Sequence, residues 1–307
     1  GSSGRIFPVE MKAAPLLRAW LAHLKAHHVQ FFYRHQITQL QENTLTIQSL
    51  AEQTTVQHSY DAIILACGAI SWPQLGSDGQ WQAWFNADDL QPFYASNVGI
   101  ECAWSAFLTP YFGQALKRVT AWVNDGQTVH GDIVISHYGL ESGLIYKLNT
   151  DLRQQFQQLG TMNLMLDLLP DETLAHIQQQ LQQKNKQSLN SKLKRLGLDV
   201  VKIALLRECT DKNRWQDAQY MAQHIKQCTV IAHDFRPIQE AISCAGGVKR
   251  NALHDDGFQL KANPKVYCCG EMLDWDAPTG GYLLTACFAT GRAVGEQIQT
   301  NLGLTKK

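Results

Sequence analysis

The segment that most constrains the fold of this chain is a short apolar run that ends in glycine and is followed by a glycine pair. Residues 265–269 (KVYCC) run into Gly270, and Gly280 and Gly281 precede small and apolar residues that continue to Gly291. An unbroken apolar run of this kind is typical of a parallel strand that is covered on both faces. The sequence therefore predicts a buried strand, an acidic turn and a helix that begins near Gly281.

The residues between this strand and the helix suit a nucleotide. A strand that ends in glycine lets a ligand approach the backbone, and an acid just beyond it accepts hydrogen bonds from ribose or ribityl hydroxyl groups. Gly270 has the first role here, and Glu271 or Asp274 has the second. The same residues also suit a tight turn in which the acids cap the helix. Both interpretations stay open at this point.

The predicted helix start offers another contact. Gly280 and Gly281 leave the amide groups of the first turn without partners, with the positive end of the helix dipole behind them. This arrangement favours the electron-rich N1 and O2 edge of a reduced isoalloxazine ring. Tyr282 and Leu283 follow directly, and Tyr282 either stacks near such a ring or packs in the core.

A second apolar run lies far upstream. Residues 60–69 (YDAIILACGA) close in the small residues Ala66, Cys67 and Gly68, and such a run is typical of a parallel strand that is covered on both faces. Such an ending resembles the second sequence motif of disulfide-reductase-like flavoproteins, in which small residues admit the dinucleotide. We expect the two strands to lie side by side at one flavin site.

The rest of the chain separates into segments of different character. Apolar residues at helical spacing predict a helix over residues 11–27. Short β-rich stretches then predict a small antiparallel layer; they are residues 29–33, 37–40, 44–47 and 55–58. Alternating and β-branched residues from about 93 to 167 predict a β-barrel or sandwich, and Leu- and Gln-rich residues from 169 to about 224 predict several packed helices.

Composition weighs against several classes of function. Lys plus Arg and Asp plus Glu both number 27, so the net charge is zero and no nucleic acid or anionic membrane partner is expected. No apolar run approaches the roughly 18 residues that span a bilayer, and no signal-peptide pattern is present, which predicts a cytoplasmic protein. The eight cysteines lack CxxC spacing, which favours buried free thiols over disulfides or a metal site.

Several motifs together resemble one family. They are residues 1–8 with 11–13, 66–79, 136–143, 245–248 and 270–291. In this order they look like the bacterial NAD(P)/FAD-dependent oxidoreductase family, which includes the so-called aminoacetone oxidase family proteins and flavin reductases proposed for bile-acid breakdown. The resemblance implies FAD as cofactor, NAD(P)H as a transient hydride donor, a small-molecule substrate and hydride transfer to a second acceptor.

The resemblance also implies a fold. It is an α/β fold with a Rossmann-like FAD-binding domain of three layers, an inserted β-barrel-like domain and a small helical subdomain. The FAD-binding domain is expected to comprise residues 1–90 and 245–307. The insert is expected to comprise residues 91–168 with a return strand in 226–244, and the helical subdomain residues 169–225.

Individual residues take roles by the same resemblance. The expected cofactor-binding residues are Ala66, Cys67, Gly68, Gly270, Glu271, Asp274, Gly280, Gly281, Tyr282 and Leu283. His137 lies in a loop expected to face the flavin and substrate, where it orients substrate, relays a proton or has a structural role. Arg236 binds an anionic substrate group or a surface carboxylate. For Cys67, Cys268 and Cys269, apolar surroundings favour inert packing over a redox dithiol.

One family feature is missing from this sequence. Family members begin with a strand, a GxGxxG-type loop and a helix, and no such motif precedes Gly1. We therefore expect a truncated chain that binds FAD weakly, because the pyrophosphate lacks its backbone donors, and unpaired strand edges in the sheet. The alternative functions are a non-catalytic remnant or interaction module and an RNA-modifying flavoprotein; the zero net charge weighs against the second.

Overall fold

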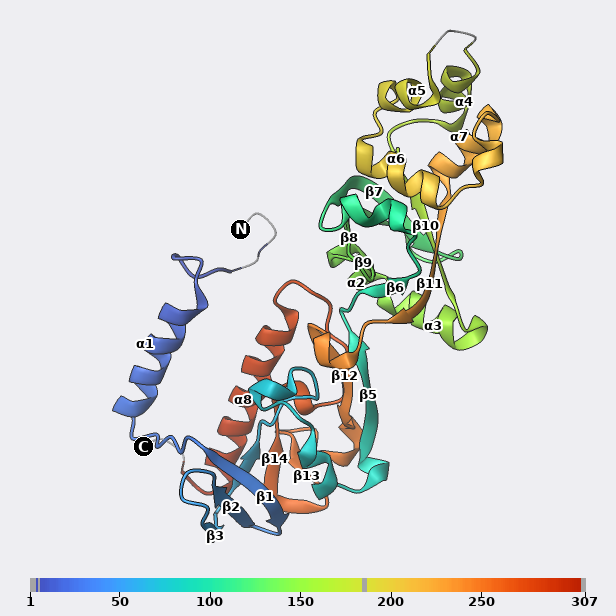
Figure 1. Ribbon diagram of the computed structural model, residues 1–307. Coiled ribbons are helices and arrows are strands. Elements are labelled where there is room, and N and C mark those ends of the chain that lie inside the picture. Colours follow the sequence, from blue (N-terminus) through green and yellow to red (C-terminus); the bar gives the residue numbers. More distant parts are fainter. Residues whose placement is uncertain (1–3, 5, 184–186, 305–307) are drawn as a thin grey trace.

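The computed structural model describes residue 4, residues 6–183 and residues 187–304. Figure 1 shows a lower lobe that holds the beginning and the end of the described chain, a β-barrel above it, and a group of helices beyond the barrel. This arrangement confirms the predicted α/β architecture with a barrel insertion and a helical subdomain.

The two apolar runs form adjacent parallel strands, as predicted. β4 (Ile63–Leu65) pairs with β14 (Asn263–Cys268), and Ile64 lies opposite Tyr267. β13 (Gln259–Leu260) runs antiparallel along the other edge of β14. A parallel pair between segments so far apart in sequence requires the intervening chain to leave this sheet and return.

The parallel pair is the middle layer of the lower lobe. On one face, helix α8 (Tyr282–Asn301) packs its Val294 against Tyr267. On the other face, Leu45 belongs to the same buried cluster as Ile63. Leu45 lies in an antiparallel sheet that contains three of the predicted β-rich stretches; its strands are β1 (His35–Gln41), β2 (Thr44–Ser49) and β3 (Thr55–Ser59).

The expectation that β4 is covered on both faces is wrong. Ile63 and Leu65 are buried, whereas 49% of Ile64 is exposed. Ile64 shares a face with Tyr267 because the two are register partners. The exposure shows that α8 covers Tyr267 and leaves Ile64 open. In the described part of the chain only β14 pairs with β4, so the outer edge of β4 is unpaired, as expected.

The first helix is confirmed as α1 (Ala13–Ala26), but residues 29–33 are not a strand. His28 and Arg34 on either side have left-handed backbone φ angles of 63° and 58°. Left-handed residues also flank β1, at Arg34 and Glu42, so they do not by themselves exclude a strand. Residues 29–33 differ from β1 because no strand of the described chain pairs with them. The β-propensity of this stretch therefore reflects exposed aromatic residues such as Phe32, which is 69% exposed.

The middle of the chain forms a closed barrel, which confirms the first of the two predicted alternatives and shows that the sandwich is wrong. Its strand order is β10–β11–β6–β9–β8–β7. The strands are β6 (Ile100–Cys102), β7 (Ala115–Val123), β8 (Val129–Ile135), β9 (Gly139–Glu141), β10 (Met162–Asp167) and β11 (Cys228–Phe235). The expected return strand, β11, closes the barrel between β10 and β6. Two helices, α2 (Gly143–Lys147) and α3 (Asn149–Leu159), pack on it.

Two further strands pair with each other at the junction between lobe and barrel. β5 (Leu90–Ser96) and β12 (Ser243–Val248) are antiparallel, so residues 91–96 lie outside the barrel itself. Glycine permits this pairing, because a Cβ at Gly246 would lie 2.5 Å from the Pro92 carbonyl oxygen. A Cβ at Gly247 would lie 2.2 Å from the Met272 carbonyl oxygen.

The predicted helices lie at the far end of the barrel (Figure 1). They are α4 (Leu174–Gln182), α5 (Leu189–Arg195), α6 (Val200–Glu208) and α7 (Ala218–Lys226). Their apolar side chains, among them Ile177, Leu205 and Ile225, join the barrel interior in one buried cluster. Across the described residues, every helix is too short or too polar to cross a bilayer.

Candidate functional site

The ends of β4 and β14 bring predicted cofactor residues together. The Cys269 amide donates to the Leu65 carbonyl at 3.0 Å. The loops that follow β4 and β14 therefore begin side by side, at the carboxyl ends of the two strands. Gly68 and Gly270, just beyond, both have left-handed φ angles, 72° and 77°. The Gly270 amide is held by the Thr290 hydroxyl of α8 at 3.1 Å. Cys67 and Ala66 lead into this corner and are half-buried and exposed, respectively.

The two predicted acids differ in their surroundings. Glu271 is half-buried, accepts a hydrogen bond from the Cys244 amide at 3.1 Å, and burial raises the pKa of its carboxyl group. Asp274 is exposed, and partial desolvation raises its pKa while Lys249 opposes the rise. The Asp274 amide donates to Val248 at 2.8 Å, which fixes its backbone. Neither carboxylate caps α8, which argues against the cap interpretation.

The amino terminus of α8 is open. Gly280 and Gly281 have φ angles of 116° and 93°, and Gly281 is the N-cap without a side-chain hydrogen bond. A Cβ at Gly281 would meet no atom within 4 Å. Tyr282 is 61% exposed, so the alternative in which it packs in the core is wrong. Leu283 is half-buried. The first-turn amides and the helix dipole therefore face open space.

This arrangement fits one part of FAD. The open helix start and the left-handed glycines at the strand ends leave backbone donors accessible, which suits the flavin ring and the ribityl chain. The described residues contain no glycine loop and helix start of the kind that binds a pyrophosphate after a first strand.

His137 lies on a tightly held turn at the barrel rim. Its neighbour Tyr138 accepts a hydrogen bond from the Cys102 amide at 2.8 Å through the carbonyl oxygen. A Cβ at Gly139 would lie 2.0 Å from the Ile100 carbonyl oxygen, so only glycine fits there. The His137 side chain is exposed and contacts the Tyr138 ring, with 5.2 Å between the two ring centroids.

Comparison with known proteins agrees with this geometry. The HI0933-like protein Rossmann domain family matches residues 1–297. The chain belongs to this family. It is also similar to the 3-dehydro-bile acid delta(4,6)-reductase of Clostridium scindens, with 22% identity over 317 residues that cover 95% of this chain and 75% of that protein. The lower lobe is thus Rossmann-like, and the family and this relative together suggest a flavin-dependent oxidoreductase.

Asn97, which sequence reasoning missed, connects the loop before α8 of this HI0933-like protein to strand β12. Asn97 is 4% exposed and donates from Nδ2 to the Ala277 carbonyl oxygen at 2.7 Å and to Ser243 Oγ at 2.5 Å. Next to it, Ser96 donates a hydrogen bond to Asp276. No sequence motif marks these residues, because their partners lie far away along the chain.

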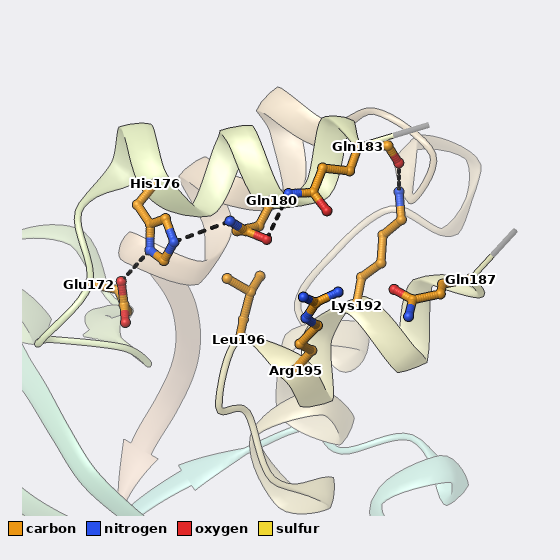
Figure 2. A pocket seen from close by; sticks show the side chains of 8 residues that line it. All are labelled: Glu172, His176, Gln180, Gln183, Gln187, Lys192, Arg195 and Leu196. Atoms are coloured by element: carbon orange, nitrogen blue, oxygen red, sulfur yellow. Dashed lines mark hydrogen bonds and ion pairs between the residues drawn. The ribbon is translucent and has the colours of Figure 1, made fainter. Parts of the chain in front are cut away.

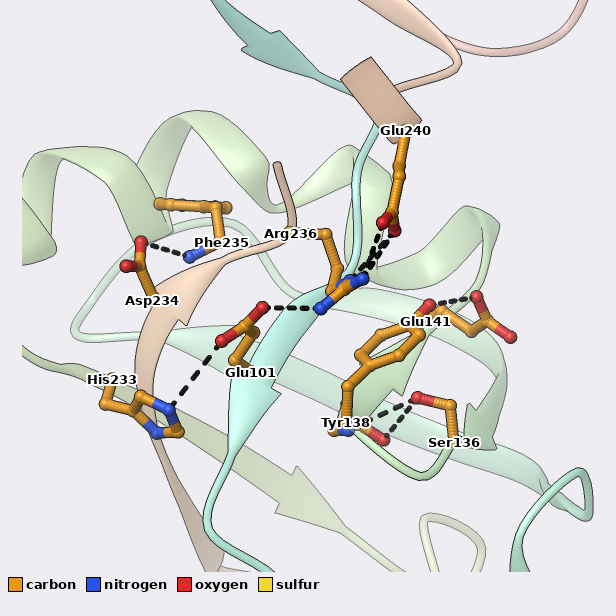
Figure 3. Close-up of polar contacts among 10 residues, drawn as sticks. Glu101, Ser136, Tyr138, Glu141, His233, Asp234, Phe235, Arg236 and Glu240 are labelled. Atoms are coloured by element: carbon orange, nitrogen blue, oxygen red, sulfur yellow. Dashed lines mark hydrogen bonds and ion pairs between the residues drawn. The ribbon is translucent and has the colours of Figure 1, made fainter. Parts of the chain in front are cut away.

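Arg236 binds carboxylates of this chain, which was one of its two predicted roles. Its guanidinium group contacts Glu240 at 2.6 Å and Glu101 at 2.7 Å and lies 4.5 Å from the centre of the Tyr138 ring. Figure 3 shows these side chains around the turn that carries Tyr138. The positive charge of Arg236 is therefore compensated within the molecule.

The cysteines near the strand ends are in a setting that suits packing. All eight cysteines are free thiols, as predicted. Burial raises the pKa of the Cys67, Cys268 and Cys269 thiols, so they stay protonated at neutral pH. A reactive thiol needs a lowered pKa and an accessible position. These findings favour inert packing over a redox dithiol.

A cavity of about 240 Å³ lies in the helical subdomain, away from the predicted site residues. Figure 2 shows a row of contacts along one side of it, from Glu172 through His176 and Gln180 to Gln183. His176 contacts Glu172 at 2.5 Å, and Lys192 donates to the Gln183 carbonyl oxygen at 2.7 Å. The Lys192 contact connects α5 with the end of α4, and the cavity lies outside the candidate flavin site.

Proposed function

We propose that this protein is an FAD-dependent oxidoreductase that passes a hydride between NAD(P)H or an organic substrate and a second acceptor. The observation that carries the proposal is the uncapped amino terminus of α8, in a helix whose Thr290 also holds the end of β14. Family membership and the similarity to a bile-acid reductase support the same chemistry.

Each group at the site has a definite task in this proposal. FAD, when bound, supplies the hydride chemistry. The amides of Tyr282 and Leu283, with the dipole of α8, would lie against the electron-rich edge of the ring and would favour negative charge there. Gly270 lets the cofactor approach the end of β14, and Glu271 and Asp274 accept hydrogen bonds from ribityl or ribose hydroxyl groups.

The substrate side of the proposal involves the barrel. His137 is exposed at the rim on a fixed turn, where its imidazole can orient a small organic substrate or relay a proton. A nucleic acid or anionic membrane partner forms no part of the proposal, because the net charge is zero.

The first test is retention of flavin. The purified chain is mixed with excess FAD and desalted, and its visible absorbance is recorded; NADH or NADPH is then added to see whether the flavin absorbance bleaches. Because the described residues contain no pyrophosphate-binding loop, the proposal expects wild type to retain only a fraction of the flavin. The Gly281→Val variant should lose that fraction, because the side chain would cover the first-turn amides. A colourless wild-type protein would overturn the proposal for this chain and favour a non-catalytic interaction module.

A matched variant separates loss of the site from loss of the fold. Gly303 follows the other end of α8, also has a left-handed φ angle of 66°, and would also place a Cβ in open space. Gly303→Val should retain flavin to the same extent as wild type. Equal loss in both variants would mean that the strain of the substitution, and not the amide contact, causes the effect.

A further inference from the structure

We propose that Arg236 is the positioning residue for His137: stacked on Tyr138 and ion-paired to Glu101 and Glu240, it fixes the turn that presents the imidazole. The inference rests on the proposed function for what His137 does to a substrate. The positioning itself is a property of the protein without cofactor and can be tested on its own.

The guanidinium group of Arg236 is held from two directions. Its Nη1 donates to Glu101 at 2.7 Å, and its Nε and Nη2 donate to the two oxygens of Glu240 at 2.9 Å and 2.6 Å (Figure 3). Glu101 lies on β6, where the chain enters the barrel, and Glu240 lies where the chain returns to the lower lobe. A planar group with a fork contact to one carboxylate and a single hydrogen bond to another on a second side is held in one orientation.

That orientation determines where the Tyr138 ring lies. The guanidinium carbon is 4.5 Å from the ring centre, and the Tyr138 hydroxyl group donates to Glu141. On another side the backbone of Gly99 is so close that a Cβ there would lie 3.0 Å from ring carbon Cε2. The ring is therefore enclosed by the arginine, a carboxylate and the backbone.

The fixed ring in turn determines the position of His137. Tyr138 directly follows His137, and Ser136 on the other side accepts a hydrogen bond from Trp104 Nε1 at 3.0 Å through its carbonyl oxygen. The Ser136 hydroxyl group also donates to the Gly139 carbonyl oxygen at 3.2 Å. Both neighbours of His137 are thus anchored while its imidazole points to solvent.

Arg236 does not serve as a substrate-binding cation in this scheme. Its side chain is 22% exposed, and its three donor positions are used by two carboxylates. These carboxylates raise the pKa of Arg236, so it stays charged throughout the accessible pH range. Its effect on a reaction at His137 is exerted through Tyr138, without contact with the reacting groups.

The experiment compares Arg236→Gln with wild type by hydrogen exchange of the cofactor-free protein. We expect exchange of the backbone amides of residues 136–142 to become about tenfold faster or more, because charge-assisted hydrogen bonds and the ring stack are lost. The carbon-bound proton signals of the His137 ring should shift, while those of histidines in the helical subdomain stay unchanged. Arg236→Lys should show the same faster exchange and the same shifted His137 signals, because an ammonium group lacks the planar fork.

A matched control is present in the helical subdomain. Arg214 stacks on Tyr220 at 3.9 Å and pairs with Asp217 at 3.2 Å, so Arg214→Gln removes the same kinds of contact elsewhere. It should leave residues 136–142 and His137 unchanged. The proposal is overturned if Arg236→Gln leaves exchange and the His137 signals as in wild type, or if Arg214→Gln changes them equally.

Two additions keep the test decisive. If Arg236→Gln does not fold, Glu240→Gln removes one carboxylate at a half-exposed position and should give a smaller change of the same kind. Flavin retention is measured on each folded variant. Loss of turn protection with no flavin in wild type would support the positioning role and refute the proposed function, whereas retained flavin with an unchanged turn would refute the positioning role alone.

Discussion

Asn97 and Ala277, which are 180 residues apart in sequence, are joined by a hydrogen bond of 2.7 Å from the Asn97 side chain to the Ala277 carbonyl oxygen. The backbone carbonyl of Asn97 also accepts a hydrogen bond from the Ile242 amide at 3.3 Å. One side chain therefore fixes the loop that leads into α8 to both chain segments that connect the lower lobe with the barrel. The geometry of the candidate site depends on this contact.

Removing the Asn97 side chain should destabilise the protein. Asn97→Ala leaves the buried Ala277 carbonyl and Ser243 hydroxyl without a donor and places alanine at a φ angle of 54°, which should cost about 2–3 kcal/mol of unfolding free energy. Urea unfolding measures the loss. Asn86→Ala removes an exposed contact with Asp89 and should change stability by less than about 0.5 kcal/mol. Equal effects would contradict the role given to Asn97.

Gly139→Ala should damage the barrel rim. The added Cβ would lie 2.0 Å from the Ile100 carbonyl oxygen, so the β6–β9 pairing must shift, at a cost of about 3 kcal/mol or more. Thermal unfolding followed by circular dichroism measures it. Gly160→Ala, at a left-handed position after α3 with open space around the Cβ, should cost about 1 kcal/mol. A Gly139 variant as stable as the Gly160 variant would contradict the close approach described for the turn.

Truncating neighbouring residues on β4 should destabilise the protein to very different degrees. Ile63→Ala removes a buried side chain and should cost about 2–5 kcal/mol, whereas Ile64→Ala should cost less than about 1 kcal/mol because half of its surface is already in water. Chemical unfolding of both variants measures the difference. Equal costs would show that the open face of β4 is covered in solution.

Glu271 should give stability a specific dependence on pH. Burial raises its pKa above the ordinary value of 4.5, so the folded state binds the proton more tightly than the unfolded state. Its contribution is therefore most favourable below 4.5 and is lost as the pH rises to the raised folded pKa. Glu271→Gln removes this dependence, so the variant should gain on wild type across that window. A difference that stays constant with pH would contradict the burial effect.

The sequence predicted the parts of the fold that depend on local pattern. The strand before Gly270 and the helix after Gly281 follow from a contiguous apolar run and a glycine pair, and both are present. The exposure of Ile64 could not be predicted, because it depends on which strand α8 crosses. Residues 29–33 have the propensity of a strand but are not one, because no strand of the described chain pairs with them, and a local pattern does not record pairing.

Some residues of the candidate site could likewise be predicted from local pattern, and others could not. Glycines and acids at strand ends are visible as motifs, so the residues around Gly270 and Gly281 could be named from the sequence. The contact of Asn97 with Ala277 and that of Arg236 with Glu101 could not be predicted, because these partners lie 180 and 135 residues away and no local pattern records them. Contacts of this kind follow only from the way the barrel sits on the lower lobe.

The hydrogen bond between Ile242 and Asn97 has a consequence for how the molecule can change. The chain leaves the lower lobe and returns to it at points that touch, at 3.3 Å between the Ile242 nitrogen and the Asn97 oxygen. The entropic cost of closing a loop comes from bringing its two ends together. An inserted domain whose ends already lie side by side therefore adds little to the cost of folding the domain that carries it. The barrel and its helices therefore connect β5 to β12 in the way that a tight turn would, because they bring the ends of the two strands to the same place. We therefore expect that a short turn could replace the barrel and its helices while β5 and β12 keep their pairing.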